Sequence, residues 1–236
     1  MMEIKVCGMR DSDNIRAVSE LGVDYIGLIF WEKSPRNVTM IPTHAGIIPD
    51  RGSLTQPSAS VTEGQTSASY PTTSPKRVGV FVNEMAQNII TRVVNYQLDI
   101  VQLHGQESPT LIRNLRATLS DEIRPTLRYW KAISISDEES ITGWHHYEDC
   151  IDGFVFDTKC ITVGGSGRQF DWSVLEAYDG DKPFLLSGGI GPDDMERIKA
   201  FRHPMFRGID LNSRFETSPG VKDVDSLKRF LSALRQ

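Results

Sequence analysis

The segment Asp157-Thr158-Lys159, followed by Gly164-Gly165-Ser166-Gly167 and Phe170-Asp171-Trp172, decides which fold the sequence encodes. The largely apolar run from Ile151 to Phe156 predicts a buried strand, and the strand end places the carboxylate of Asp157 in a glycine-rich loop. Active sites of α/β barrels are built from the loops that follow the carboxyl ends of parallel strands. Asp157 is therefore the first catalytic candidate.

The start of the chain shows the same alternation of strand and helix. Ile4–Val6 predicts a strand that ends at Cys7, and Ser12 is expected to cap a helix that stops at Gly22. Tyr25–Phe30 is a second apolar strand. These elements form one β/α/β unit within about thirty residues, which is typical of a parallel sheet.

Further strands and helices alternate to the end of the chain. Apolar runs predict strands at 77–82, 100–103, 127–133, 184–186 and 206–209, and the spacing of apolar residues predicts helices at 85–96, 109–119, 137–146, 192–201 and the C-terminus. Eight such units in 236 residues predict an α/β fold with a single (β/α)8 TIM barrel domain over residues 1–236. A doubly wound open sheet is the alternative fold.

Residues 43–75 interrupt this alternation. Of these 33 residues, 19 are Ser, Thr, Pro or Gly and three are charged, so helix propensity is low. We interpret the stretch as a mobile insertion that replaces or extends the second helix, because it has too few apolar side chains for a second domain. A lid over the active site is the functional alternative.

Composition excludes several classes of protein. The net charge of -5 and the pI near 5.6 argue against a nucleic-acid surface. Residues 1–10 lack the apolar core of a signal peptide, and no run of 18 apolar residues occurs, so we expect a cytoplasmic protein without membrane contact. Cys7, Cys150 and Cys160 are an odd set without CxxC spacing, which favours reduced thiols over disulfides or a zinc site. No metal is expected.

A candidate phosphate site lies at Ser187-Gly188-Gly189, between a predicted strand and a predicted helix. Glycines allow the backbone to approach an anion closely, and the N–H groups at a helix start favour negative charge. The loops after strands seven and eight of TIM barrels often bind phosphate. The alternative is a tight turn that needs positive φ and binds nothing.

Three residues near strand ends have both a functional and a structural interpretation. Cys7 either fills the barrel mouth or acts as a base, and a thiol with a pKa of about 8.5 then needs positive charge nearby. Arg36 is either a solvated side chain or a group that supplies part of that charge and recognises an anion. His104 either bonds to substrate or fills the barrel rim.

Two carboxylates, Asp157 and Asp210, end predicted strands. Each either accepts hydrogen bonds from loop N–H groups or takes part in catalysis. A general acid needs a raised pKa, which burial or a second carboxylate nearby produces. The sequence leaves both interpretations open.

Six motifs occur in the order found in phosphoribosylanthranilate isomerase, which the sequence resembles over nearly its whole length except residues 43–75. They are Lys5-Val6-Cys7-Gly8-Met9, Lys33-Ser34-Pro35-Arg36, Val78-Gly79-Val80-Phe81-Val82-Asn83, Val101-Gln102-Leu103-His104-Gly105, Phe156-Asp157-Thr158-Lys159 with Gly164-Gly165-Ser166-Gly167, and Leu186-Ser187-Gly188-Gly189. Six ordered motifs are far more specific than any one of them.

This resemblance implies a TIM barrel of tryptophan biosynthesis that acts without a metal or cofactor. The implied reaction converts N-(5-phosphoribosyl)anthranilate into 1-(2-carboxyphenylamino)-1-deoxyribulose 5-phosphate, an Amadori rearrangement. The resemblance assigns Asp157 as the general acid that protonates the furanose ring oxygen. It assigns Cys7 as the general base that takes the C2′ proton.

Substrate contacts follow from the resemblance in the same way. It implies that Arg36 meets the anthranilate carboxylate and that Ser187, Gly188 and Gly189 belong to the phosphate loop. It also implies that Asp210 and Ser213 lie in the last substrate loop. We add His104 as a substrate-binding candidate from its place at a strand end.

One position departs from the family pattern. The family usually has Asp-Val-Ser-Ser-Gly-Val-Glu where this chain has residues 210–216, so Arg214 replaces a glycine. If that glycine needs positive φ, Arg214 costs on the order of 1–3 kcal/mol of local strain. Alternatively, the charge of Arg214 assists phosphate binding.

Two other functions are compatible with a barrel of this kind. A related phosphosugar isomerase of histidine biosynthesis shares the barrel, but it is expected to have an aspartate where this chain has Cys7. A catalytically silent barrel used as a ligand-binding protein is favoured only by Arg214. The expected partner is a small phosphosugar-anthranilate substrate, with no nucleic acid and no membrane, and the expected assembly is a monomer or homodimer.

Overall fold

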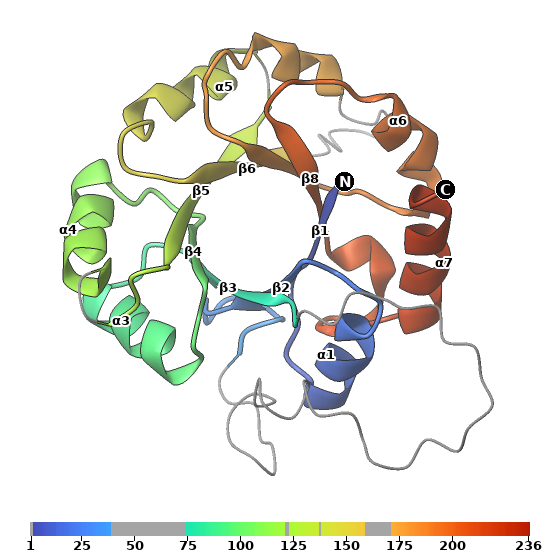
Figure 1. Cartoon of the computed structure of the whole chain (residues 1–236), viewed down its shortest axis with the longest axis horizontal. Coiled ribbons are helices and arrows are strands. Elements are labelled where there is room, and N and C mark those ends of the chain that lie inside the picture. Colours follow the sequence, from blue (N-terminus) through green and yellow to red (C-terminus); the bar gives the residue numbers. More distant parts are fainter. Residues whose placement is uncertain (1, 39–73, 121–122, 137, 159–170) are drawn as a thin grey trace.

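The computed structural model describes residues 2–38, 74–120, 123–136, 138–158 and 171–236. Eight parallel strands form a closed barrel in sequence order, with β1 beside β8 (Figure 1). The strands are β1 (Glu3–Val6), β2 (Tyr25–Ile29), β3 (Lys76–Phe81), β4 (Ile100–Leu103), β5 (Arg128–Ile135), β6 (Gly153–Thr158), β7 (Phe184–Ser187) and β8 (Phe206–Leu211). The predicted TIM barrel is confirmed, and the open-sheet alternative is wrong.

Helices surround this barrel in the described part of the chain (Figure 1). The α-helices are α1 (Ser12–Ser19), α3 (Ala86–Asn95), α4 (Pro109–Ser120), α5 (Glu138–Ile141), α6 (Met195–Ala200) and α7 (Val224–Leu234). The 3-10 turns are η1 (Thr142–His146), η2 (Trp172–Ala177), η3 (Pro192–Asp194) and η4 (Ser213–Phe215), and a short hairpin joins β9 (Glu216–Ser218) to β10 (Val221–Lys222). Helices α1 and α7, from opposite ends of the chain, lie side by side.

Some predicted helices differ from those observed. Asp11 caps α1 by accepting a hydrogen bond from the Asn14 N–H at 2.8 Å, so Ser12 is the first helical residue rather than the cap. The helix predicted at 137–146 is one turn of α5 followed by η1, because Gly143 has low helix propensity. The helix predicted from Pro192 begins as the turn η3 before α6.

The core has two layers that meet at the barrel wall. Most buried side chains lie between the strands and the helices. A second cluster fills the inside of the barrel and includes Val78, Val80 and Trp130. Cys7 belongs to this inner cluster. Alternate residues of each strand point inward, so the ends of the strands present side chains to the barrel mouth.

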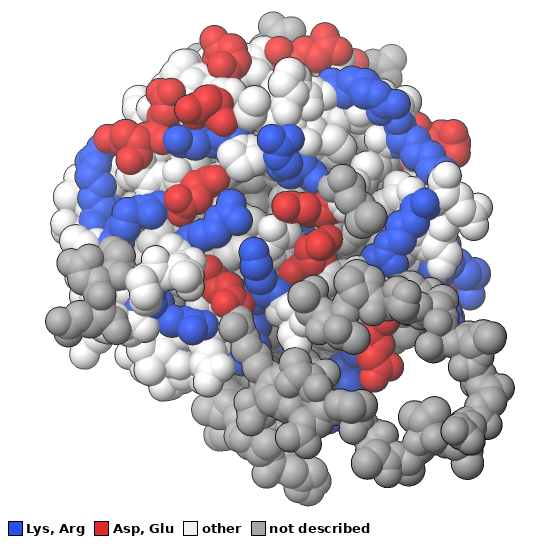
Figure 2. Space-filling view, in the orientation of Figure 1, with Lys and Arg blue, Asp and Glu red and all other residues white. Residues whose placement is uncertain are grey.

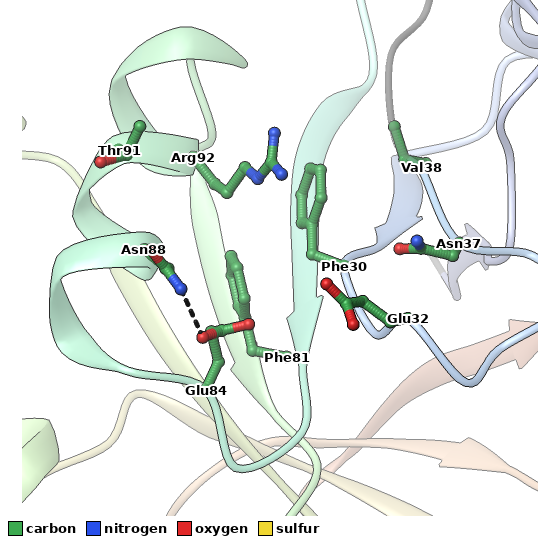
Figure 3. Close-up of a pocket in the computed structure, with 9 residues that line it drawn as sticks. All are labelled: Phe30, Glu32, Asn37, Val38, Phe81, Glu84, Asn88, Thr91 and Arg92. Atoms are coloured by element: carbon green, nitrogen blue, oxygen red, sulfur yellow. Dashed lines mark hydrogen bonds between the residues drawn. The ribbon is translucent and has the colours of Figure 1, made fainter.

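The insertion predicted at residues 43–75 lies outside the described residues except for Ser74 and Pro75. The described chain breaks after Val38, which borders a groove of about 560 Å³ between α3 and the ends of β2 and β3 (Figure 3). In that groove the guanidinium of Arg92 lies 5.3 Å from the ring centre of Phe30.

Charged side chains of both signs are interspersed over the described part of the face in Figure 2. That face therefore carries no uniform basic stripe of the kind that nucleic-acid-binding proteins present. Within the described ranges, every helix is too short or too polar to span a lipid bilayer.

Candidate active site

A cavity of about 180 Å³ lies at the carboxyl ends of the barrel strands. Of the nine predicted site residues, all but Arg36 line it, and these are Cys7, His104, Asp157, Ser187, Gly188, Gly189, Asp210 and Ser213. Its other lining residues are Ile29, Val80, Gln102, Ile190 and Asn212. Barrel closure therefore brings together residues from both ends of the chain.

Asp157 and His104 form a pair across the cavity. The Nε2 atom of His104 lies 3.3 Å from Oδ2 of Asp157, and the two side chains are 30% and 24% exposed. Strand β6 carries Asp157, and His104 follows β4, where its backbone N–H donates to the Phe81 carbonyl at 2.8 Å. The candidate acid therefore has a titratable partner that the sequence did not predict.

Asp210 faces a buried lysine from the neighbouring strand. The Lys5 Nζ donates to Asp210 Oδ2 at 2.7 Å, with the side chains 0% and 6% exposed. Burial raises the pKa of the Asp210 carboxyl, Lys5 opposes this, and Asp157 adds to it. The second oxygen, Oδ1, is buried and has no hydrogen-bond partner among the described residues.

The thiol of Cys7 is buried beside the same lysine. Burial raises its pKa, the positive charge of Lys5 opposes that rise, and Asp210 adds to it. The thiol fits because position 27 is glycine, where an added Cβ would lie only 2.7 Å from the Sγ. The sequence predicted that Arg36 supplies part of the positive charge, and Arg36 and Cys7 do interact by charge, but in the structure Lys5 has the largest such effect on the thiol.

Arg36 lies next to the cavity rather than in its lining. Its Nε and Nη2 donate to the two oxygens of Glu216 at 2.8 and 2.6 Å, and Lys222 donates to the same carboxylate at 2.6 Å. Burial alone would raise the pKa of Glu216, but the bonds from Arg36 and Lys222 lower it to about 2. Gly8 makes room for Arg36, because an added Cβ would lie 2.6 Å from the arginine Cδ.

Backbone geometry explains the glycines of the predicted phosphate loop. Gly188 has φ of 102° and Gly189 has φ of 65°, values that side-chain-bearing residues rarely adopt. An added Cβ on Gly188 would lie 2.0 Å from the carbonyl oxygen of Thr158. The tight-turn interpretation therefore accounts for both glycines, and phosphate binding stays a prediction.

Arg214 shows no sign of the strain considered above. It lies in the turn η4, and the described non-glycine residues with positive φ are Asn83 and Gln97. Its guanidinium is near the loop after β7, with Nη2 3.9 Å from an oxygen of Asp193. The strain alternative is wrong, and a contribution of the charge to phosphate binding stays a prediction.

Several sequence predictions fall on residues that are not described. Lys159, the Gly164–Gly167 motif and Phe170 lie outside the described ranges, as does Cys160. Cys7 and Cys150 are free thiols. In the described ranges, no three His, Cys, Asp or Glu side chains are arranged to hold a metal ion.

Comparisons with known proteins identify the family. The family described as N-(5'-phosphoribosyl)anthranilate (PRA) isomerase matches residues 43–233. An N-(5'-phosphoribosyl)anthranilate isomerase of Parabacteroides distasonis is 43% identical over 99% of this chain and 93% of its own length.

Solved structures agree with this result. A phosphoribosylanthranilate isomerase in complex with reduced 1-(o-carboxyphenylamino)-1-deoxyribulose 5-phosphate has a TM-score of 0.71 and 26% identity, covering 100% of this chain and 99% of that one. Monomers generated from the dimeric phosphoribosylanthranilate isomerase of Thermotoga maritima give 0.69 and 27%, with the same coverage. Whether this chain is a monomer or homodimer stays a prediction. Family match, sequence relatives and barrel agree, and the chain belongs to the N-(5'-phosphoribosyl)anthranilate isomerase family.

Proposed function

We propose that the cavity at the barrel mouth isomerises N-(5-phosphoribosyl)anthranilate to 1-(2-carboxyphenylamino)-1-deoxyribulose 5-phosphate, a step of tryptophan biosynthesis. The observation that carries the proposal is that Cys7 and Asp157 line one cavity from β1 and β6. Strands β7 and β8 separate these two on one side and four strands do so on the other. An acid and a base on such strands reach one sugar from different sides.

Asp157 acts as the general acid in the first step. Its carboxyl proton goes to the furanose ring oxygen, the ring C–O bond breaks, and a protonated Schiff base forms. His104, 3.3 Å from the Asp157 carboxylate, keeps the carboxyl directed into the cavity. The step leaves Asp157 ionised.

Cys7 acts as the general base in the second step. The thiolate takes the C2′ proton, and the C–H electrons form the enolamine double bond as the iminium is neutralised. Tautomerisation to the ketone moves a proton from the 2′ oxygen to C1′. Transfer of one proton from Cys7 to Asp157 through solvent then restores the starting state.

Polar groups around the cavity anchor the rest of the substrate. Ser187, Gly188 and Gly189 provide backbone N–H groups for the phosphate, and Arg36 uses Nη1 for the anthranilate carboxylate while Glu216 holds its Nε and Nη2.

Two buried acceptors are available for the sugar hydroxyls. Gln102 Oε1 and Asp210 Oδ1 both belong to cavity-lining side chains and lack partners among the described residues. Ser213, also in the lining, adds a hydroxyl. A bound sugar would satisfy acceptors whose burial otherwise costs free energy.

Single-turnover conversion of freshly generated phosphoribosylanthranilate, followed by loss of anthranilate-type fluorescence, tests the proposal. Wild type should turn over, and Cys7→Ala and Asp157→Asn should each lose at least about a hundredfold, the low end of acid–base contributions. Circular dichroism of both variants controls for folding. A folded wild type without turnover would refute the function, and a variant within a few-fold of wild type would remove that residue's role.

A further inference from the structure

Lys5 is a fully buried lysine that the mechanism above does not use. It lies on β1 two residues before Cys7, so both side chains point into the barrel. Its side chain is 0% exposed, and it donates to Asp210 Oδ2 at 2.7 Å. Burying an ammonium group costs several kcal/mol unless it is paired. Asp210 provides that pair, and we ask what else the buried ammonium contacts.

The positive charge of Lys5 also acts on the thiol. The charge of its ammonium opposes the rise that burial gives the pKa of Cys7, and Cys7 in turn helps to raise the pKa of Lys5. An ammonium has three N–H donors, and Asp210 occupies one of them. The remaining donors are available to a sulfur on the same face of the strand.

The charged and titratable groups around the thiol come from six elements, and they are Lys5 on β1, Arg36 after β2, His104 after β4, Asp157 on β6, Asp210 on β8 and Lys222 on β10. Among them, only the cations oppose the effect of burial on the thiol.

Two of these cations are committed to another carboxylate. Arg36 and Lys222 both bind Glu216, and Lys222 also donates to Asn212 Oδ1 at 2.9 Å. Lys222 acts on Cys7 by charge alone, and less strongly than Lys5. Lys5 is the cation whose charge acts most strongly on the thiol, and it lies two residues before Cys7 on the same face of β1.

We infer that Lys5 is a positioning residue that orients the Cys7 side chain and stabilises its thiolate from beneath the cavity. The inference rests on the proposed function, because a thiolate matters only if Cys7 removes a proton. Lys5 does not line the cavity and keeps its own proton throughout the reaction. It acts through Cys7, and Asp210 offsets its charge.

The direct test is titration of the Cys7 thiol in the substrate-free protein. The rate of alkylation by iodoacetamide is measured against pH and read for Cys7 alone by peptide mass spectrometry, so Cys150 and Cys160 stay in place. Lys5→Met should raise the thiol pKa by on the order of one unit, which lowers the thiolate fraction at neutral pH about tenfold. The acidic limb of kcat/KM should move to higher pH by the same amount. Lys76→Met, which removes an exposed lysine from the start of β3, should leave both unchanged.

A second pair of variants removes the unpaired carboxylate that Lys5→Met leaves at Asp210, so that the comparison does not depend on how that carboxylate responds. Asp210→Asn alone is compared with Lys5→Met combined with Asp210→Asn. The double variant should have the higher thiol pKa. Equal thiol titration in these two proteins would overturn the role of Lys5.

The outcomes separate this inference from the proposed function. A thiol that shifts as expected in a protein without isomerase activity would uphold Lys5 and refute the function. An active enzyme whose thiol pKa does not change when Lys5 is replaced would uphold the proposed function and refute the role of Lys5.

Discussion

Two buried lysines of the barrel, Lys5 on β1 and Lys131 on β5, differ in how completely their networks are satisfied. The Nζ of Lys131 donates to the carbonyls of Leu103, Gly105 and Ala132 and lies 3.3 Å from Glu107 Oε2. The Lys5 network instead includes a buried oxygen of Asp210 without a partner among the described residues.

The partner carboxylates show the same difference. Glu107 also accepts from the backbone N–H groups of Asn83 and Gly105, at 2.8 and 2.9 Å. It thereby joins the loops after β3 and β4 to β5. Asp210 has one oxygen on Lys5 and the other buried beside the cavity. The network of Lys131 and Glu107 is closed, in that each of its polar groups has a partner, and it fixes the loop that carries His104. In the network of Lys5 and Asp210 one buried oxygen lacks a partner among the described residues, and the proposed function assigns that oxygen to a bound sugar.

Breaking the closed network should give the largest loss of stability. Lys131→Met leaves the Glu107 carboxylate buried without its cation, and we expect the free energy of unfolding to fall by about 3–5 kcal/mol. Lys5→Met should cost less than half as much, because the pKa of Asp210 is already raised by burial and its carboxyl can take up a proton. Urea unfolding followed by tryptophan fluorescence measures both values. Equal losses would contradict the distinction between the networks.

Glu216 is a second carboxylate whose two oxygens both have partners, and its contribution to the free energy of unfolding depends on pH. Its folded-state pKa of about 2 lies below the ordinary value near 4.3, so its stabilisation is present above pH 4.3 and is lost as pH falls towards 2. Each pKa unit of depression corresponds to about 1.4 kcal/mol, so the stabilisation is at most roughly 3 kcal/mol before solvent screening reduces it. Glu216→Gln should therefore be less stable than wild type at neutral pH and lose less stability on acidification.

The measurement is the difference in unfolding free energy between wild type and Glu216→Gln at a series of pH values from 6 down to 2. Glu196→Gln, which changes an exposed carboxylate on α6, is the matched control. A difference that does not depend on pH would show that Arg36 and Lys222 do not keep Glu216 ionised.

The barrel and most of its mouth could be predicted because they depend on local patterns. Apolar runs mark the strands. The candidate site residues Cys7 and His104 directly follow strand ends, and Asp157 is the second-last residue of β6. The ion pairs could not be predicted in this way. Lys5 and Asp210 are 205 positions apart, and Arg36 and Glu216 are 180 apart, so each pair depends on the register with which the barrel closes.

One signal for Lys5 was present in the sequence. In the run Ile4-Lys5-Val6-Cys7, alternation of side chains gives Lys5 the same face as Cys7. If Cys7 faces the barrel mouth, Lys5 must face the barrel interior. Gln102 on β4 has the same relation to His104, which follows that strand, and the structure places both in the cavity lining. Parity with a candidate catalytic residue is therefore a usable guide to polar groups inside a barrel.

Gln102 is a neutral counterpart of Asp210, with a buried oxygen that lacks a partner. Its side chain is 1% exposed, and its Oε1 has no hydrogen-bond partner among the described residues. Replacing it by methionine removes a buried unsatisfied acceptor, so Gln102→Met should raise the unfolding free energy of the free protein by about 1 kcal/mol. The same change should weaken binding of reduced 1-(o-carboxyphenylamino)-1-deoxyribulose 5-phosphate, an analogue of the proposed product, about tenfold, since a hydrogen bond to a sugar hydroxyl is lost. Thermal unfolding and calorimetric titration measure the two effects, and a destabilised variant would show that Gln102 is structural.

Replacing Arg214 should give the smallest change in stability, because its charge is exposed to solvent and belongs to neither buried network. Its side chain is 57% exposed and its 3.9 Å pair with Asp193 is solvated, so Arg214→Ala should change the unfolding free energy by less than about 0.5 kcal/mol. Near the loop after β7, its charge should still attract a phosphate, and we expect KM to rise about twofold to threefold at low salt. Because exposed charges are screened, this difference should disappear at high ionic strength. A KM that is the same at both ionic strengths and in both proteins would show that the arginine replacing the family glycine takes no part in substrate binding.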